Sequence, residues 1–136
     1  MYYVVNAHFI TGKEVSTILV IEDSETQRLY LKAMLNRLGH QVIEACNGKQ
    51  GIKLFDKDTI DLVMTDIFMP EKEGLSTIME LKEMSPRLKI IAMSAGSRAM
   101  HNAFEIAVEF GADACYEKPF EMGLLKDMLT KLLRAD

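Results

Sequence analysis

The amino-acid sequence predicts an α/β fold, a doubly wound parallel sheet of five strands with five helices. Five short strand-like segments alternate with five amphipathic segments, in units of about two dozen residues. Such alternation is typical of parallel strands joined by right-handed helical crossovers, with helices on both faces of the sheet. The 136 residues are enough for one continuous core. We expect one domain over residues 16–136, preceded by a poorly ordered or loosely docked extension, 1–15.

The expected strands are short apolar runs bounded by turn residues, the pattern of strands covered on both faces. The clearest are the run from Thr17 to Ile21 and the central run from Leu62 to Thr65. The full set spans residues 17–21, 41–45, 62–65, 89–93 and 114–117. Because these strands are expected to be parallel, their carboxyl ends should meet at one edge of the sheet.

Capping and breaker residues place the expected helices. Ser24 followed by Gln27 predicts a capping box at the start of the first helix, and Gly39 predicts its end. The other four are expected after Asn47-Gly48 to about Asp58, from just after Gly74 to Pro86, over 99–110 and over 121–134.

Composition disfavours several classes of partner. The net charge of −4 argues against a nucleic-acid or anionic-membrane surface, both of which favour basic side chains. No apolar run approaches the roughly 18–20 residues of a membrane span, and the first residues lack a secretory signal pattern. Cys46 and Cys115 show no metal-binding or redox spacing. Both are therefore expected to be free thiols of a cytoplasmic protein.

Polar residues with complementary chemistry follow four of the five expected strands. Glu22 and Asp23 follow the first strand, and Asp66, Ser94 and Lys118 follow the third, fourth and fifth. Carboxylates gathered at one edge repel one another unless a cation compensates, and an oxygen-only ligand set favours Mg²⁺. A carboxylate can also attack phosphorus as a nucleophile. A lysine and a hydroxyl would then serve the phosphoryl oxygens.

The segments ILVIED, LVMTDIFMP, IIAMSAGS and GADACYEKPF resemble the receiver domain of the two-component response regulator family. The resemblance runs from about Thr17 to Arg134 and implies a flavodoxin-like strand order. It implies that Asp66 accepts a phosphoryl group from a histidine kinase or a histidine phosphotransfer protein. Ser94 matches the hydroxyl that moves toward the phosphoryl group, and Lys118 the lysine that pairs with it.

The resemblance also implies a magnesium site. Asp23 resembles the direct Mg²⁺ ligand, Glu22 its acidic neighbour that acts through water, and Asp66 a further ligand. The backbone carbonyl of Phe68 matches a third metal contact. The Lys118-Pro119 peptide bond is expected to be cis, as X-Pro bonds allow.

The function expected from this resemblance is that of a single-domain response regulator, a monomer or weak dimer. It is not an enzyme beyond catalysing its own phosphorylation and dephosphorylation. A downstream protein would bind the helix over 99–110, the strand over 114–117 and the helix over 121–134. One alternative is a docking module that works without phosphorylation. A phosphohydrolase would need a second acid two residues after Asp66, where Phe68 stands.

Two positions depart from the family pattern. An aromatic residue often precedes the lysine by three positions, and here Cys115 stands there. Neighbours in a strand point to opposite faces, so Tyr116 cannot take its place. A polar residue often stands where this chain has Phe68 and can orient a hydrolytic water. The phenyl ring cannot, so we expect a long-lived phosphorylated form and a shorter half-life after Phe68→Asn.

Overall fold

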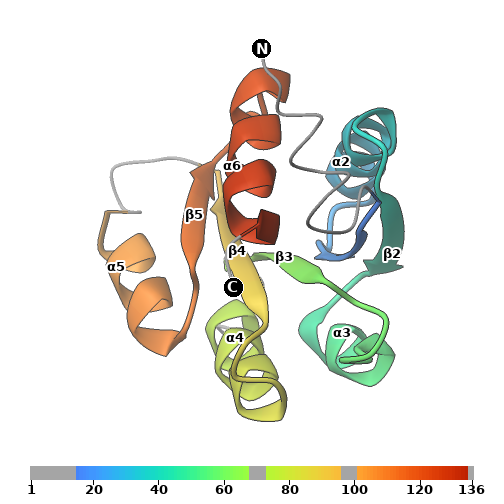
Figure 1. Cartoon of the computed structure of the whole chain (residues 1–136). Coiled ribbons are helices and arrows are strands. Elements are labelled where there is room, and N and C mark those ends of the chain that lie inside the picture. The colour runs from blue at the N-terminus through green and yellow to red at the C-terminus, as the bar shows by residue number, and fades with distance from the viewer. Residues whose placement is uncertain (1–14, 68–72, 96–100, 135–136) are drawn as a thin grey trace.

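The computed structural model describes residues 15–67, 73–95 and 101–134. In these residues five parallel strands form one sheet with the order β2-β1-β3-β4-β5 (Figure 1). The strands are β1 (Thr17–Ile21), β2 (Gln41–Ala45), β3 (Leu62–Asp66), β4 (Lys89–Ser94) and β5 (Ala114–Glu117). The predicted fold class is confirmed, with β3 at the centre of the sheet, β1 and β4 beside it, and β2 and β5 at its edges.

Five helices connect or follow the strands in the described residues. They are α2 (Glu25–Arg37), α3 (Gly48–Leu54), α4 (Glu73–Met84), α5 (His101–Phe110) and α6 (Met122–Arg134). In Figure 1, α2 and α6 cover one face of the sheet, and α3, α4 and α5 cover the other. Doubly wound sheets have helices on both faces in this way.

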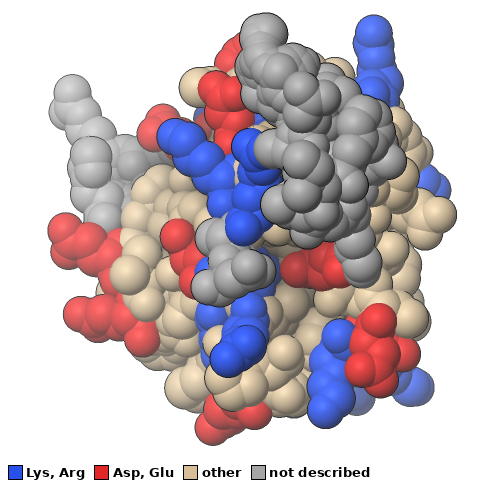
Figure 2. Space-filling model, viewed as in Figure 1, with Lys and Arg blue, Asp and Glu red and all other residues tan. Residues whose placement is uncertain are grey.

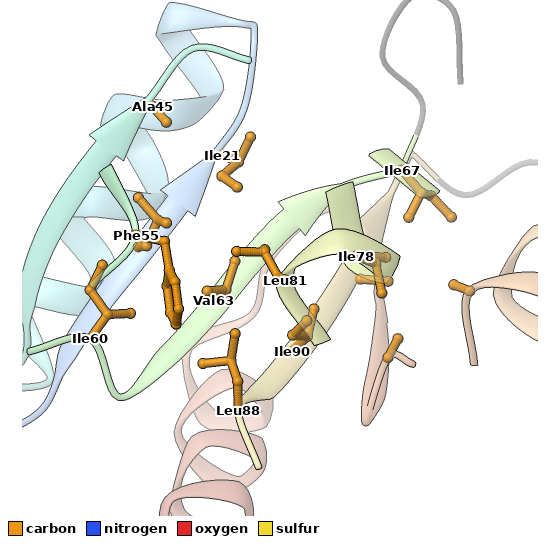
Figure 3. Close-up of a cluster of buried hydrophobic side chains, with 14 residues drawn as sticks. Ile21, Ala45, Phe55, Ile60, Val63, Ile67, Ile78, Leu81, Leu88 and Ile90 are labelled. Atoms are coloured by element: carbon orange, nitrogen blue, oxygen red, sulfur yellow. The ribbon is translucent and has the colours of Figure 1, made fainter. Parts of the chain in front are cut away.

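The alternation of side chains along each strand divides the core into two clusters. Ile21, Val63 and Ile90 point to the face of α3, α4 and α5, in the cluster that contains Ile78 and Leu81 (Figure 3). The intervening strand residues point to the other face and meet α2 and α6. That second cluster comprises Ile18, Val20, Leu62, Met64, Ile91, Met93 and Tyr116 from the strands, with Leu31, Met34, Leu35, Leu125 and Leu129 from the helices. Continuous apolar strands are needed because both faces are covered.

Three expected helix boundaries differ from the structure, one of them being the start of the last helix at Met122 rather than at residue 121. The second helix ends at Leu54 rather than near Asp58, because Phe55 already has extended backbone. The Asp56 carbonyl then accepts hydrogen bonds from the amides of Thr59 and Ile60 and forms a separate turn. Gly74 was expected just before α4 but is the second residue of that helix. A β-carbon on Gly74 would collide with the backbone of Asp66 and Ile67, so glycine allows this first turn to lie close to the end of β3.

Glycine ends two of the described helices, and the predicted end at Gly39 is confirmed. Gly39 ends α2 with φ +94°, and Gly111 ends α5 with φ +124°. A residue with a β-carbon rarely adopts this backbone conformation, so glycine is the favoured residue at such helix ends.

The surface carries both signs of charge. On the face in Figure 2, Lys and Arg side chains gather near the centre, with Asp and Glu side chains on either side. Across the part of the chain that the structure describes, no helix combines the length and apolarity needed to cross a membrane.

Candidate functional site

The predicted site residues are positioned by the carboxyl ends of four strands. Asp66 is the last residue of β3 and Ser94 the last of β4, each one residue beyond the expected strand end. Glu22 follows β1, and Lys118 follows β5. Backbone hydrogen bonds extend the sheet past these ends, from the Glu22 amide to Ala45 and from the Lys118 amide to Ser94. The expectation that these residues share one edge is confirmed for all four.

The ammonium group of Lys118 is the centre of the site. Its Nζ lies 2.6 Å from Oε1 of Glu22 and 2.7 Å from Oδ2 of Asp66. A third acceptor, Oε1 of Gln27, lies 2.5 Å from the same nitrogen. The three charged side chains are at most 10% exposed, so solvent screens their interaction weakly. Two carboxylates thus share a single positive charge.

Burial and charge shift the pKa of two of these groups. Burial raises the pKa of Glu22, and the Asp66 charge adds to the increase. Hydrogen bonds from Lys118 and the Ser24 amide partly offset that increase. Burial by itself lowers the pKa of Lys118, but hydrogen bonds and charges from Asp66 and Glu22 outweigh it, so the pKa is raised. Lys118 therefore stays charged at neutral pH and compensates the carboxylates.

The start of α2 holds Glu22 in place. Oε2 of Glu22 accepts a hydrogen bond from the Ser24 amide at 3.1 Å. Its backbone carbonyl accepts from Nη1 of Arg28 at 2.9 Å, and Nε of Arg28 donates to Glu44 at 3.1 Å. Both the side chain and the backbone of Glu22 are therefore fixed by neighbours on α2 and β2.

The predicted capping box is only half formed. Ser24 caps α2 as expected, and its hydroxyl accepts from the Gln27 amide at 3.3 Å. The Ser24 amide, however, donates to Glu22 rather than to the Gln27 side chain. The Gln27 amide oxygen is thereby available to Lys118. The sequence predicted Gln27 only as a capping residue. Its contact with Lys118 was not predicted, because no local pattern indicates a contact between residues 91 positions apart.

Ser94 is fully buried, and its hydroxyl oxygen has no hydrogen-bond partner among the described residues. Unpaired buried hydroxyl groups are uncommon and cost about 1–3 kcal/mol. Ser94 lies on the strand next to Asp66, at the same edge of the sheet. A ligand oxygen at this edge would satisfy the hydroxyl group.

The donor set suits a hard cation. Glu22 and Asp66 converge on one ammonium group, and both offer carboxylate oxygen, the ligand type that Mg²⁺ prefers. Asp23 is adjacent to Glu22 but exposed, and Phe68 lies outside the described residues. Within residues 15–67, 73–95 and 101–134, no three His, Cys, Asp or Glu side chains are already gathered at metal-binding distance.

Cys115 and Tyr116 point to opposite faces of β5, as predicted. The Cys115 thiol packs among α5 residues, with Sγ 3.8 Å from the Phe104 carbonyl oxygen, and burial raises its pKa. The Tyr116 hydroxyl accepts from the Glu121 amide at 2.7 Å on the other face, and its ring lies 4.9 Å from that of Phe120. Tyr116 is thus tied to the start of α6. The Lys118-Pro119 bond is cis, as predicted.

Comparison with known proteins defines the class. The family model described as the response regulator receiver domain matches residues 18–130. Chemotaxis protein CheY of Thermotoga maritima is 33% identical over 117 residues, which cover 85% of this chain and 95% of CheY. Sporulation initiation phosphotransferase F of Bacillus subtilis is 28% identical, with coverage of 85% and 92%. The chain belongs to the receiver domain family of two-component systems.

Other relatives are much longer than this chain. The sensor protein EvgS of Escherichia coli is 35% identical over 123 residues, but the chain covers only 10% of EvgS. Among solved structures, a receiver domain protein from Clostridium thermocellum has a TM-score of 0.80 at 26% identity, covering 87% of this chain and 94% of that one. Response regulator TrrA of Thermotoga maritima, solved with Mg²⁺ and beryllofluoride, has a TM-score of 0.76 at 31% identity, with coverage of 86% and 98%. Receiver domains therefore occur both alone and within sensor proteins.

Proposed function

We propose that Asp66 accepts a phosphoryl group from a phosphohistidine of a histidine kinase or a histidine phosphotransfer protein, in a Mg²⁺-dependent reaction. The observation that carries the proposal is the Asp66 carboxylate, buried at the carboxyl edge of the sheet and paired with Lys118. The Ser94 hydroxyl at the same edge, unpaired within the described part of the chain, supports it. A buried carboxylate beside a lysine and an unused hydroxyl group suits the binding of a charged group rich in oxygen acceptors.

The proposed reaction is a displacement at phosphorus. An Asp66 carboxylate oxygen forms the new P–O bond while the P–N bond to the donor imidazole breaks, and the imidazole keeps the electron pair. Lys118 donates to a phosphoryl oxygen, as does the Ser94 hydroxyl, and both stabilise charge on the transferred group. The product adds about −1.5 to −2 charges at this point of the sheet edge.

The metal would be held by the carboxylates of Asp23 and Asp66 and the backbone carbonyl of Phe68, with Glu22 acting through water. When bound, Mg²⁺ neutralises charge on the carboxylates and the phosphoryl oxygens. Without the metal, Lys118 neutralises part of the carboxylate charge, because its ammonium group pairs with both Glu22 and Asp66.

The proposed readout surface consists of α5, β5 and α6. Ile106, Val108 and Leu124 are exposed apolar side chains on these helices. A groove of about 560 Å³ runs between β5 and α6, where Cys115 and Met128 are among the lining residues. Movement of Ser94 and Lys118 toward a phosphoryl group would alter the strands that support this surface. A downstream protein that discriminates the two forms would bind here.

Intact-mass analysis tests the proposal. The protein is incubated with a small phosphodonor and Mg²⁺, alongside Asp66→Ala and a sample with chelator. Asp58→Ala is the matched control because Asp58 is an exposed aspartate in the turn before β3, whereas Asp66 lies at the far end of that strand. We expect a single phosphoryl gain in wild type and Asp58→Ala, and none in Asp66→Ala or with chelator. A folded wild-type protein that gains no mass would instead support a docking module that works without phosphorylation.

A further inference from the structure

We propose that Gln27 is a positioning residue that holds Lys118 before phosphorylation and is displaced by the phosphoryl group. The proposal rests on phosphorylation of Asp66 as the function of the site. Its structural basis is the hydrogen bond between Lys118 Nζ and Gln27 Oε1, 2.5 Å long, which joins the first turn of α2 to the residue after β5.

The Lys118 ammonium group has a fixed number of hydrogen-bond donors. A lysine ammonium has three N–H bonds and no acceptor. Lys118 directs them to three acceptors, which are Glu22, Asp66 and Gln27. Its donors are therefore fully used before phosphorylation. A phosphoryl oxygen can receive a hydrogen bond from Lys118 only if one of these three acceptors is given up.

The three acceptors differ in strength and exposure. Glu22 and Asp66 are buried carboxylates in the unphosphorylated protein, so charge attraction to Lys118 adds to their hydrogen bonds, and neutral Gln27 lacks this attraction. Glu22 keeps its charge after phosphorylation, and leaving it buried without Lys118 would be costly. Gln27 is neutral and exposed, so its amide oxygen can bond to water once it is released. Gln27 is thus the acceptor whose loss costs least.

The exchange leaves the hydrogen-bond count of Lys118 unchanged. One N–H turns from Gln27 Oε1 to a phosphoryl oxygen, while the bonds to Glu22 and to the Asp66 oxygen that is not phosphorylated can persist. Gln27 competes with the phosphoryl group in this scheme and favours the unphosphorylated state. Removing its acceptor should therefore strengthen the binding of a phosphoryl mimic rather than weaken it.

Two substitutions separate this role from a merely structural one. Gln27→Met keeps the length of the side chain and removes the acceptor, and Gln27→Glu keeps the acceptor. Thr26→Met is the matched control, since Thr26 is the preceding exposed residue in the same turn of α2. Because these positions are exposed, all three variants should fold.

The experiment measures beryllofluoride affinity by titration calorimetry at saturating Mg²⁺. We expect Gln27→Met to bind about threefold to tenfold more tightly than wild type, the equivalent of one hydrogen bond. Gln27→Glu and Thr26→Met should show no such gain. Equal or weaker binding by Gln27→Met would overturn the proposal, as would an equal gain in Gln27→Glu or Thr26→Met.

Urea unfolding with and without Mg²⁺ and beryllofluoride gives the second readout. The stability lost by Gln27→Met in the free protein should disappear in the bound protein, because wild type has already given up the bond there. A loss of equal size in both states would identify a structural role and overturn the proposal. If wild type itself binds no beryllofluoride, the proposed phosphorylation of Asp66 is overturned as well. Failure of the proposed function can therefore be distinguished from failure of the Gln27 proposal alone.

Discussion

Gly74 lies directly against the backbone of Asp66. A β-carbon built on Gly74 would collide with the Asp66 carbonyl oxygen and with the backbone of Ile67. The first turn of α4 therefore packs on the end of β3 at the residue that carries the phosphoacceptor carboxylate. Only glycine permits this approach, because the atoms in its way belong to the backbone and cannot rotate aside.

Replacement of Gly74 should be costly for this reason. In an unhindered helix, Gly→Ala stabilises by about 1 kcal/mol, but the collision should reverse the sign. We expect Gly74→Ala to lower the free energy of unfolding by about 1–3 kcal/mol and to impair phosphorylation, as measured by urea denaturation and intact mass. Gly123→Ala in α6 is the control, since its nearest neighbour is the flexible Glu121 carboxylate. Equal stabilities of the two variants would contradict the packing argument.

Lys118 should matter for stability as well as for chemistry. Lys118→Met leaves the buried carboxylates of Glu22 and Asp66 without their shared cation. We expect a loss of roughly 2–4 kcal/mol at neutral pH without metal. Added Mg²⁺ should restore more stability to the variant than to wild type, because a second cation then replaces the first. Urea denaturation with and without Mg²⁺ measures both effects, with Lys53→Met at an exposed position as control.

Glu44 should make stability depend on pH in the acid range. A hydrogen bond from Lys32, then one from Arg28, lowers the pKa of Glu44 below its ordinary 4.5. A carboxyl group with a lowered folded-state pKa stabilises above its unfolded pKa, and the contribution is lost as pH falls through the folded value. Glu44→Gln should cost about 0.5–1 kcal/mol at pH 7 and progressively less below pH 4.5. A cost independent of pH in urea denaturation would argue against the ion pairs.

Cys115 should be a passive packing residue. Its thiol makes one long contact with the Phe104 carbonyl and otherwise packs among apolar side chains. Cys115→Ala should lower the free energy of unfolding by about 1 kcal/mol and leave phosphorylation-dependent partner binding intact. Pull-down of the partner with and without phosphodonor gives the readout, and loss of the difference would assign Cys115 a part in switching.

One physical reason explains why the sequence predicted both the strands and the sheet edge that carries the site residues. Strands covered on both faces must be continuously apolar, so a charged or polar residue such as Asp66 or Lys118 marks their ends. Parallel direction then brings these ends together. The sequence therefore predicted that Glu22, Asp66, Ser94 and Lys118 share an edge, and the structure has them there.

The features that the sequence did not predict depend on how the helices pack against the sheet. Gln27 meets Lys118 only because α2 has a particular rotation over the sheet, and the capping pattern suggested a different partner. The close approach of Gly74 to Asp66 similarly depends on the position of α4. The early end of α3 follows from the conformation of Phe55, whose ring packs in the core. Such tertiary effects override local propensity.

The Ser94 hydroxyl, which has no hydrogen-bond partner among the described residues, should make heat stability and phosphorylation compete. Ser94→Ala removes an unpaired buried polar atom, so it should raise the melting temperature of the unphosphorylated protein while slowing its phosphorylation. A library screened for heat resistance alone would therefore enrich this substitution, and a library screened for phosphorylation would reject it. Retention of serine at this position under both screens is the outcome that would contradict the trade-off.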